Sequence, residues 1–452
     1  MPLEAMASTL PASELSLWWG LPFAGILLSI ALMPLFMSRL WHHHTGKIII
    51  MWILILLVPL YYCYGWSITL NTVAHALIQE YLPFMLLLLA LYTISGSIVI
   101  HIHISGGTRL NILLLAAGTL LAGIMGTTGA SMLLIRPLLR INAHRQHRAH
   151  VVIFFILLVG NIGGGFTPLG DPPLFLGFLK GVGFIWTVQH MLCPVLLNSS
   201  ILLTIFYFLD RHYWRRESSQ IHQTTNHNKT WQIQGKINLI LLLAVVAVVL
   251  FSGLWNNSTV WSYHGIEISL VAVVRDGLLA LITILALVGT DSKLRQLNHF
   301  NWAPMQEVGK LFAGIFITLS PVMLMLQAGS LGHFRELVNL LQQHGEPVNP
   351  LYFWVSGLLS GFLDNAPTYL VFFNLAGGNA ALLMQQFPAT LLAISMGSVF
   401  MGALSYIGNA PNLMVKAIAE QQRVTMPGFF AYMVWSFTLL IPILCLNAIL
   451  FI

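Results

Sequence analysis

Two aspartates, Asp171 and Asp364, lie inside apolar stretches of this 452-residue chain, whereas most of its 14 acidic residues lie at loops or predicted helix ends. A carboxylate within a lipid bilayer is costly, so such a residue is expected to face a cavity and to have a function there. A structural ion pair is the alternative, but no Lys or Arg adjoins either aspartate within the predicted membrane core. We therefore predict that both carboxylates bind a transported ion.

Uncharged oxygen donors accompany the two aspartates in these and other interrupted apolar stretches. The predicted ion-binding residues are Asp171, Asp364, Asn365, Asn161, Thr167, Thr127, Thr128, Asn409 and Asn412. Carboxylate, amide and hydroxyl oxygens suit a hard cation such as Na⁺. Burial favours the protonated form of a carboxylate, so a proton and a metal cation can compete for one group. We predict Asp171 and Asp364 as the metal ligands, Na⁺ and H⁺ as the transported ions, and no resident cofactor.

The rest of the chain has the composition of a membrane protein. Of its residues, 57% are hydrophobic and 8% are charged, and the mean hydropathy is +0.81, whereas a soluble domain carries about 25% charged residues. We predict an all-α polytopic protein surrounded by membrane lipid. Full spans are expected at 18–37, 48–66, 82–101, 151–177, 186–209, 237–255, 273–290, 310–328, 389–416 and 429–451.

Two further apolar stretches, 110–136 and 350–375, are interrupted by the sequences GTTGAS (126–131) and GFLDNAP (361–367). Each half is too short to cross a bilayer alone. We predict two re-entrant hairpins, which a membrane tolerates where the tip lines a protein cavity.

Two of the full spans contain glycines, prolines and asparagines near their middle, in the sequences GNIGGGFTPLGDPP (160–173) and GALSYIGNAPN (402–412). Such residues prevent regular helix hydrogen bonding, so the freed backbone groups need protein, water or an ion as partners. We predict two broken transmembrane helices. A kinked helix packed on its neighbours is the alternative.

The order of these elements predicts an inverted repeat, the plan of many secondary transporters. The expected parts are N-terminal helices (1–81), a first repeat (82–209), a cytoplasmic loop (210–236), connecting helices (237–307) and a second repeat (308–452). With a periplasmic N-terminus, this layout places all Lys and Arg on the cytoplasmic side except Lys180, Arg335 and Arg275. The net charge of +6 therefore reflects orientation in the membrane and indicates no nucleic-acid partner.

The motifs GNIGGGFTPLGDPPLFLGFLKGV, GTTGASMLLIRPLLR and FLDNAPTYLVFFNLAGG resemble those of the predicted sodium/proton antiporters of the ion transporter superfamily, an NhaD-like and putative citrate transporter group. The resemblance covers about residues 80–430. It implies a bacterial inner-membrane protein, a scaffold domain, a mobile transport domain moving like an elevator, and a homodimer.

The T-P-I-G-D run of NhaD-type proteins resembles Thr167–Asp171, and their D-N-x-P element resembles Asp364–Pro367. This chain departs from NhaD-type proteins at Pro172 and Pro173, which replace hydroxyl residues that often follow the aspartate. The second broken helix also offers amides in place of a Ser/Thr cluster.

Three functions are compatible with two aspartates inside a membrane protein. A Na⁺ or Li⁺/H⁺ antiporter fits the two carboxylates best. A cation- or proton-coupled symporter of citrate or another carboxylate is the alternative, because broken helices supply N-termini that can hold an anion; no positive group is visible in the predicted core. An intramembrane aspartyl protease is disfavoured, since Pro168 breaks the G-x-G-D pattern of those enzymes. We expect no enzymatic activity.

The cysteines and one basic sequence give two further predictions. The three cysteines (Cys63, Cys193, Cys445) fit no metal or redox spacing and are predicted to be buried packing residues. The HRQHRAH sequence at 144–150 is interpreted as a solvated basic loop, with a pH sensor as the alternative.

Overall fold

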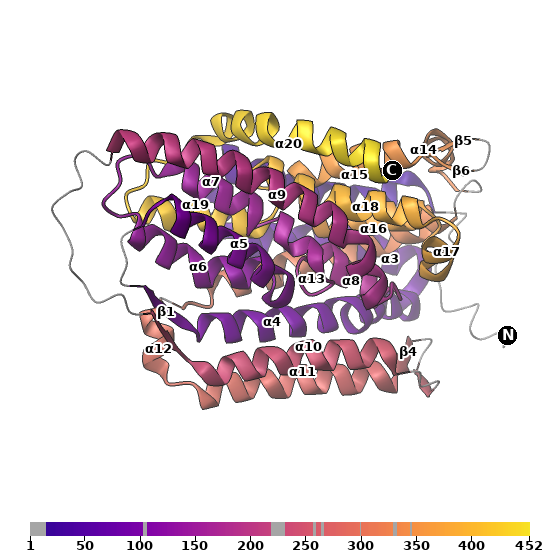
Figure 1. Ribbon diagram of the computed structural model, residues 1–452. Helices are drawn as coiled ribbons and strands as arrows, with labels where there is room; N and C mark the ends of the chain where they lie inside the picture. Colours follow the sequence, from indigo (N-terminus) through magenta and orange to yellow (C-terminus); the bar gives the residue numbers. More distant parts are fainter. Residues whose placement is uncertain are drawn as a thin grey trace.

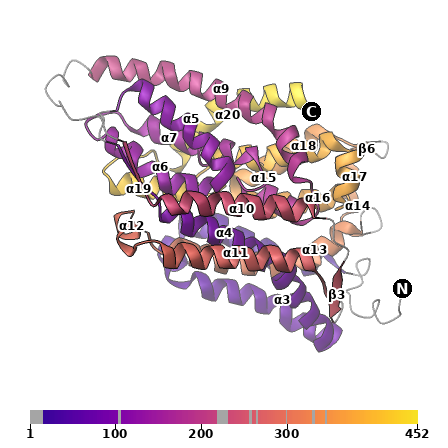
Figure 2. The ribbon, with the colours of Figure 1, turned by 60° about the horizontal axis from the view of Figure 1, so that its bottom comes forward.

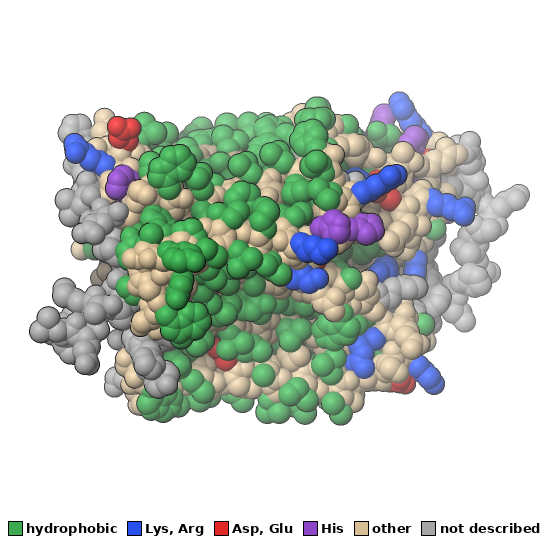
Figure 3. All heavy atoms as spheres, turned by 180° about the vertical axis from the view of Figure 1, so that it is seen from behind, with side chains coloured by type: hydrophobic (Ala, Val, Ile, Leu, Met, Phe, Trp, Pro, Cys, Tyr) green, Lys and Arg blue, Asp and Glu red, His purple; other side chains and the backbone are tan. Residues whose placement is uncertain are grey.

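The computed structural model describes residues 15–102, 106–217, 231–255, 259–263, 266–298, 300–328, 332–343 and 346–452. Within these residues, nine helical segments are long and apolar enough to cross a membrane, which confirms an all-α polytopic membrane protein. Most helices run alongside one another in one bundle (Figure 1). On the face seen in Figure 3, hydrophobic side chains cover the middle of the molecule, and most Lys and Arg side chains lie toward one end.

The N-terminal helices differ from the prediction in where they end. They are η1 (Leu17–Gly20), α2 (Leu21–Phe36), α3 (Ser38–His75), the π-helix η2 (Ala76–Tyr81) and α4 (Leu82–Gly96). The chain turns at Gly65, which interrupts α3 with φ of 80° and ψ of 175°. Glycine adopts this conformation readily because it has no side chain. The chain is then helical to Gly96, so residues 67–81, expected as a loop, are helical. Val73, Leu77 and Tyr81 recur at helical spacing and pack on the core.

The stretch 110–136 folds as a first hairpin, made of α5 (Thr108–Met125) and α6 (Thr127–Ile141), and the stretch 350–375 as a second, made of α15 (Asn349–Leu363) and α16 (Asn365–Leu375). A single residue separates the helices of each pair. Hydrogen bonds close the open ends: Gly106 N donates to Ile141 O at 2.7 Å, and Tyr352 Oη donates to Leu375 O at 3.4 Å. Entry and exit of each hairpin on one side of a membrane stays a prediction.

Two helices are interrupted where glycine and proline recur. The first interruption (159–171) lies between α7 (Ala149–Leu158) and α8 (Pro172–Leu179) and contains the short η3 (Ile162–Phe166). The second (401–409) lies between α18 (Pro388–Phe400) and α19 (Ala410–Gln421) and contains η6 (Met401–Leu404). Each interruption ends on a residue in extended conformation, Asp171 and Asn409, directly before the next helix begins.

The remaining helices are α9 (Phe184–Glu217), α10 (Lys236–Leu254), α11 (Leu270–Gly289), α12 (Ser292–Leu297), α13 (Ala303–Gln327), α14 (Arg335–Leu341), α17 (Ala380–Gln385) and α20 (Phe429–Phe451). In both ribbon views α10 and α11 lie side by side at the edge of the bundle, next to α4 (Figures 1 and 2). The helices α2, α3 and α13 pack on one another, and α2 and α13 contact the second hairpin through α15 and α16.

The expected loop at 210–236 is partly regular structure. Helix α9 continues to Glu217, and β2 (Trp231–Gln234) pairs antiparallel with β1 (Val99–Ile102). The span expected to reach residue 101 therefore ends at Gly96 and is followed by a strand. Residues 218–230 lie outside the described residues. Two other small antiparallel pairs are β3 (Val260–Tyr263) with β4 (Ile266–Ser269), and β5 (Gln342–Gln343) with β6 (Glu346–Pro347).

The predicted burial of the cysteines is wrong. Cys63, Cys193 and Cys445 are exposed on the outside of the bundle. In a membrane protein the outer surface faces lipid, so a small apolar side chain needs no burial in the core to leave water.

Candidate ion and substrate site

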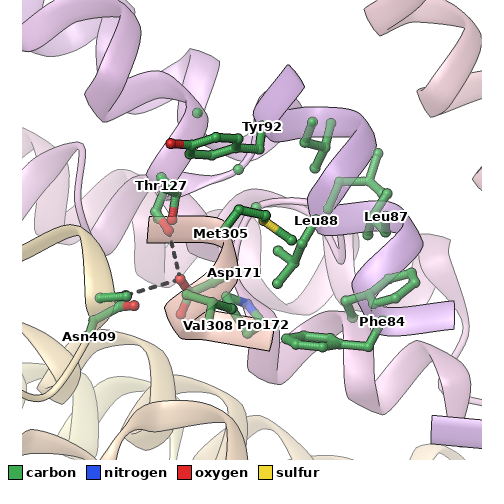
Figure 4. Close-up of a pocket in the computed structure, with 18 of the residues that line it drawn as sticks. Phe84, Leu87, Leu88, Tyr92, Thr127, Asp171, Pro172, Met305, Val308 and Asn409 are labelled. Atoms are coloured by element: carbon green, nitrogen blue, oxygen red, sulfur yellow. Dashed lines mark hydrogen bonds between the residues drawn. The ribbon is translucent and has the colours of Figure 1, made fainter. Parts of the chain in front are cut away.

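A cavity of about 100 Å³ lies where the two hairpin tips and the two interruptions meet α4 and α13. Its polar side chains are Thr127, Thr128, Asp171, Asp364, Asn365 and Asn409. The opposite wall is apolar and comes from α4 and α13; Figure 4 shows Phe84 and Leu87 across from Asp171 and Thr127. No Lys, Arg or His is among the described residues that line the cavity. A space of this size has room for several water molecules.

Asp171 is the point at which four separate segments meet. Its side chain is buried, with 2% of the residue exposed. Its Oδ1 accepts hydrogen bonds from Thr127 Oγ1 at 3.0 Å and from Asn409 Nδ2 at 3.1 Å (Figure 4). Its Oδ2 accepts a hydrogen bond from Asn365 Nδ2. Both hairpin tips and the second interruption thus hold one carboxylate of the first interruption, and all three donors are uncharged.

The local sequence explains why this carboxylate faces the cavity. Asp171 precedes α8 at the N-cap position, where an aspartate usually accepts from the backbone N–H of the first turn. Pro173 at the second helical position has no N–H group, and Leu174 N, at the third position, donates to the backbone oxygen of Asp171 at 3.2 Å. The Asp171 side chain makes no cap hydrogen bond, so its carboxylate is free to bind across the cavity.

Asp364 lies on the same cavity in a different way. It forms the tip of the second hairpin with φ of 80° and ψ of 138°, a backbone conformation that a non-glycine residue rarely adopts. Its Oδ1 accepts a hydrogen bond from Ala366 N at 3.1 Å and so caps α16. The residue is partly buried. Asp171 and Asp364 thus line one cavity, with Asp364 also serving as a helix cap.

Asn365 carries an unsatisfied oxygen next to Asp171. Its Nδ2 donates to Asp171, whereas its Oδ1 is buried and has no hydrogen-bond partner in the described part of the chain. A buried polar atom without a partner is costly. Since amide oxygen is a good ligand for a hard cation, this atom is a candidate ligand beside the carboxylate.

Three of the predicted ion-binding residues, Asn161, Asn412 and Thr167, do not line the cavity. Asn161 Nδ2 donates to Asn412 Oδ1 at 2.8 Å and joins the two interruptions. Asn412 Nδ2 donates to the backbone oxygens of the second interruption. These amides satisfy backbone and side-chain groups behind the cavity, a role that residue type alone cannot distinguish from ion binding.

Thr167 and Ser405 perform the same task in the two halves of the molecule. Thr167 Oγ1 donates to Gly123 O at 2.5 Å, and Ser405 Oγ donates to Gly361 O at 2.5 Å. Each pair is 44 residues apart along the chain. Each hydroxyl therefore fixes an interruption to the hairpin of its own half. Ser405 is absent from the predicted set, although this shared spacing could have identified it.

The HRQHRAH sequence is not a solvated loop throughout, so that interpretation is wrong for two of its residues. Arg145 and His150 are buried. Arg145 forms ion pairs with Asp210 at 2.6 Å and Glu217 at 3.2 Å, and His150 Nε2 lies 2.8 Å from Asp210 Oδ1. The end of α9 supplies both carboxylates because it continues as a helix beyond the predicted span.

Where the chain is described, no three His, Cys, Asp or Glu side chains come together in a way that could hold a metal ion. The role of Asp171 and Asp364 as metal ligands stays a prediction.

A protein-family model described as putative citrate transport matches residues 12–452. No curated protein matches the chain. Because the family model covers nearly the whole sequence, this chain belongs to the putative citrate transport family, a family of transporters of the ion transporter type.

Proposed function

We propose that this protein is a secondary transporter that exchanges Na⁺ or Li⁺ for H⁺ at Asp171. The supporting observation is the environment of that carboxylate, which is buried and accepts hydrogen bonds from three uncharged side chains. A buried carboxylate needs a partner for its charge. It can meet that need by taking up a proton or by binding a cation, and each of these excludes the other.

The cation site that we propose consists of oxygen atoms around Asp171. Its ligands are the Asp171 carboxylate, the unpartnered Asn365 Oδ1, and hydroxyls of Thr127 and Thr128 on the same cavity. Asp364 adds a second negative charge on the opposite hairpin tip. A monovalent cation gains from both charges without a resident metal or cofactor.

Alternating access requires the site to open to each side of the membrane in turn. We propose that the two hairpins are re-entrant and form, with the two interrupted helices, an inverted repeat that moves as one body past α4 and α13. The cavity wall contributed by these two helices is apolar, so sliding along it breaks few hydrogen bonds. This motion corresponds to the elevator that the resemblance implies.

Membership in the putative citrate transport family favours a second candidate, the cation- or proton-coupled symport of citrate or another carboxylate. In that case Asp171 binds the coupling ion, and the carboxylate substrate occupies the neighbouring space. The N-termini of α6, α8, α16 and α19 lie next to the cavity. Helix α8 begins with two prolines, so backbone N–H groups for an anion would come from α6, α16 and α19.

We propose an orientation of the protein in the membrane and an oligomeric state as well. The concentration of Lys and Arg toward one end of the molecule (Figure 3) supports a cytoplasmic location of that end. We propose that the protein is a homodimer in the bacterial inner membrane and that its N-terminus is periplasmic.

Purified protein in sealed vesicles with an imposed pH gradient tests the proposal. Na⁺, Li⁺, K⁺ and citrate are added one at a time. If the protein is an antiporter, only Na⁺ or Li⁺ should dissipate the pH gradient. Asp171→Asn should abolish the flux and Asp364→Asn should reduce it. Asp291→Asn is the matched control, because Asp291 is exposed at the start of α12.

Dissipation by citrate alone would select the symporter. Wild-type flux in Asp171→Asn would refute the assignment of this carboxylate under both functions.

A further inference from the structure

Arg136 on α6 is a partly buried cation for which the described residues supply no partner. Its Nη1 is fully buried and makes no hydrogen bond there, and none of the ion pairs among the described residues includes it. Burying a charge without a partner is costly, and buried charges in proteins are normally paired. Arg145, in the loop that follows α6, meets this rule through two carboxylates.

The position of Arg136 relates it to the cavity. Thr128, Met132, Arg136 and Arg140 follow one another at intervals of four residues and therefore share one face of α6. Thr128 lines the cavity, Met132 packs with Tyr92 and Met305, and Arg140 is exposed near the end of the helix. This face thus leads from the exposed end of α6 to the cavity.

Tyr92 and Met305 also line the cavity, so Arg136 lies one helical turn beyond a cluster that borders it. Figure 4 shows Tyr92 at the edge of the cavity, on the same side as Thr127. A ligand that reaches the cavity along α6 therefore passes the guanidinium.

Orientation in the membrane does not explain this residue. A positive charge on the cytoplasmic side accounts for exposed Arg140, which also suits a helix C-terminus. Orientation does not account for the partial burial of Arg136, which lies one helical turn deeper and is repelled by Arg140. A mobile anion that passes this point would provide the missing partner.

We propose that Arg136 binds a carboxylate group of an anionic substrate between the exposed end of α6 and the cavity, and that Arg140 attracts the same anion from solution. The guanidinium fork matches a carboxylate with two parallel hydrogen bonds. The substrate class is a small di- or tricarboxylate, and the inference rests on the second of the two proposed functions. Arg136 would supply a positive group near the cavity, whose own lining contains no Lys, Arg or His among the described residues.

Binding of citrate and succinate to the purified full-length protein, measured by titration calorimetry, tests this role. Arg136→Gln should weaken binding by at least about tenfold, because the anion loses a partly buried charge partner. Arg136→Lys should retain part of the affinity, since the charge remains and the fork is lost. Arg140→Gln should weaken binding less than Arg136→Gln does, because the charge of Arg140 is exposed to solvent.

Arg109→Gln is the matched control, because Arg109 is an exposed arginine on the other helix of the same hairpin. It should bind citrate as the wild type does. Removing an unpaired charge should leave the melting temperature of Arg136→Gln at or above the wild-type value, so loss of binding is separable from loss of the fold.

Wild-type protein that binds neither anion, or Arg136→Gln that binds like Arg109→Gln, would overturn the inference. Sodium-driven proton flux in vesicles without any carboxylate tests the antiporter separately, so failure of one account is distinguishable from failure of the other.

Discussion

The two halves of the site share their backbone contacts and differ in their side chains. In the first half, Thr167 holds the interruption to the hairpin, and in the second Ser405 makes the equivalent hydrogen bond. Both hairpin tips turn through a residue with positive φ, 79° at Gly126 and 80° at Asp364.

The side chains that these equivalent backbones present are different. The residue before the second half-helix is Asp171 in the first half and Asn409 in the second. The residue after the tip is Thr127 in the first half and Asn365 in the second. The two halves therefore share these backbone features, whereas the buried carboxylate Asp171 belongs to the first half and the second half supplies the amides that donate to it.

The largest expected effect comes from moving the charge between the halves. Asp171→Asn should abolish cation-driven proton flux, because no exchangeable carboxylate remains at the meeting point. Adding Asn409→Asp should restore a measurable fraction, since Asp171 Oδ1 and Asn409 Nδ2 are 3.1 Å apart and the exchange only reverses donor and acceptor. Vesicle flux of the single and double variants measures this.

Asn409→Asp alone is the control, because two neighbouring carboxylates then have to share a proton. A double variant as inactive as Asp171→Asn, although folded, would show that the two positions are not interchangeable.

A smaller effect is expected at the unpartnered amide oxygen. Asn365→Ala removes both the hydrogen bond to Asp171 and the free Oδ1. We expect the apparent Na⁺ affinity to fall roughly tenfold, the order of one lost interaction with a charged group. Asn379→Ala is a suitable comparison, because Asn379 caps α17 away from the cavity. Unchanged Na⁺ affinity in Asn365→Ala would remove this oxygen from the ligand set.

Both tips should be more stable with glycine than with alanine, because both turn through a positive φ. At Asp364 a glycine relieves the positive φ, whereas alanine retains it, so Asp364→Gly should be more stable than Asp364→Ala by about 1 kcal/mol or more. Gly126→Ala should destabilise the first tip by a similar amount. Thermal unfolding of the three variants in one detergent measures this, and equal stability of the two Asp364 variants would contradict the comparison.

The smallest effects on Na⁺ affinity belong to the hydroxyls that fix the interruptions. Thr167→Val and Ser405→Ala each remove a hydrogen bond to a hairpin carbonyl and the hydrogen bonds that the same hydroxyl accepts from backbone N–H groups of its own interruption. The expected cost is about 1–3 kcal/mol, because the carbonyl loses its donor. Since neither residue lines the cavity, Na⁺ affinity should change little. Melting temperature and Na⁺ titration of the same samples separate the two quantities, and a large loss of affinity at constant stability would count against a purely structural role.

Much of the helical layout follows from local chemistry. Clusters of glycine, proline and polar residues disfavour a continuous helix, so the interruptions before Asp171 and Asn409 and the two hairpin tips lie in the segments that the sequence indicates. Single prolines do not have this effect, since Pro137 and Pro321 lie inside helices. The same reasoning misses the helix that continues after Gly65, because a weakly polar stretch becomes helical once a tertiary core is available to its apolar face.

The site is harder to predict because residue type does not specify depth. Asn161 and Asn412 have the same donor atoms as Asn409, yet they lie behind the cavity. Arg145 and Arg136 both read as cytoplasmic basic residues, but one is held by buried carboxylates and the other has a buried nitrogen without a partner. Arg145 lies beyond α6 beside the carboxylates of α9, whereas Arg136 lies on α6, which packs against α4 and α19.

The central claim is that one carboxylate binds either a proton or a cation. Proton release from purified protein in weakly buffered detergent, followed with a pH-sensitive dye during Na⁺ addition, tests it most directly. We predict saturable release from the wild type, none from Asp171→Asn, and wild-type release from Asp291→Asn. Absence of release from the wild type, or equal release from Asp171→Asn, would contradict the account.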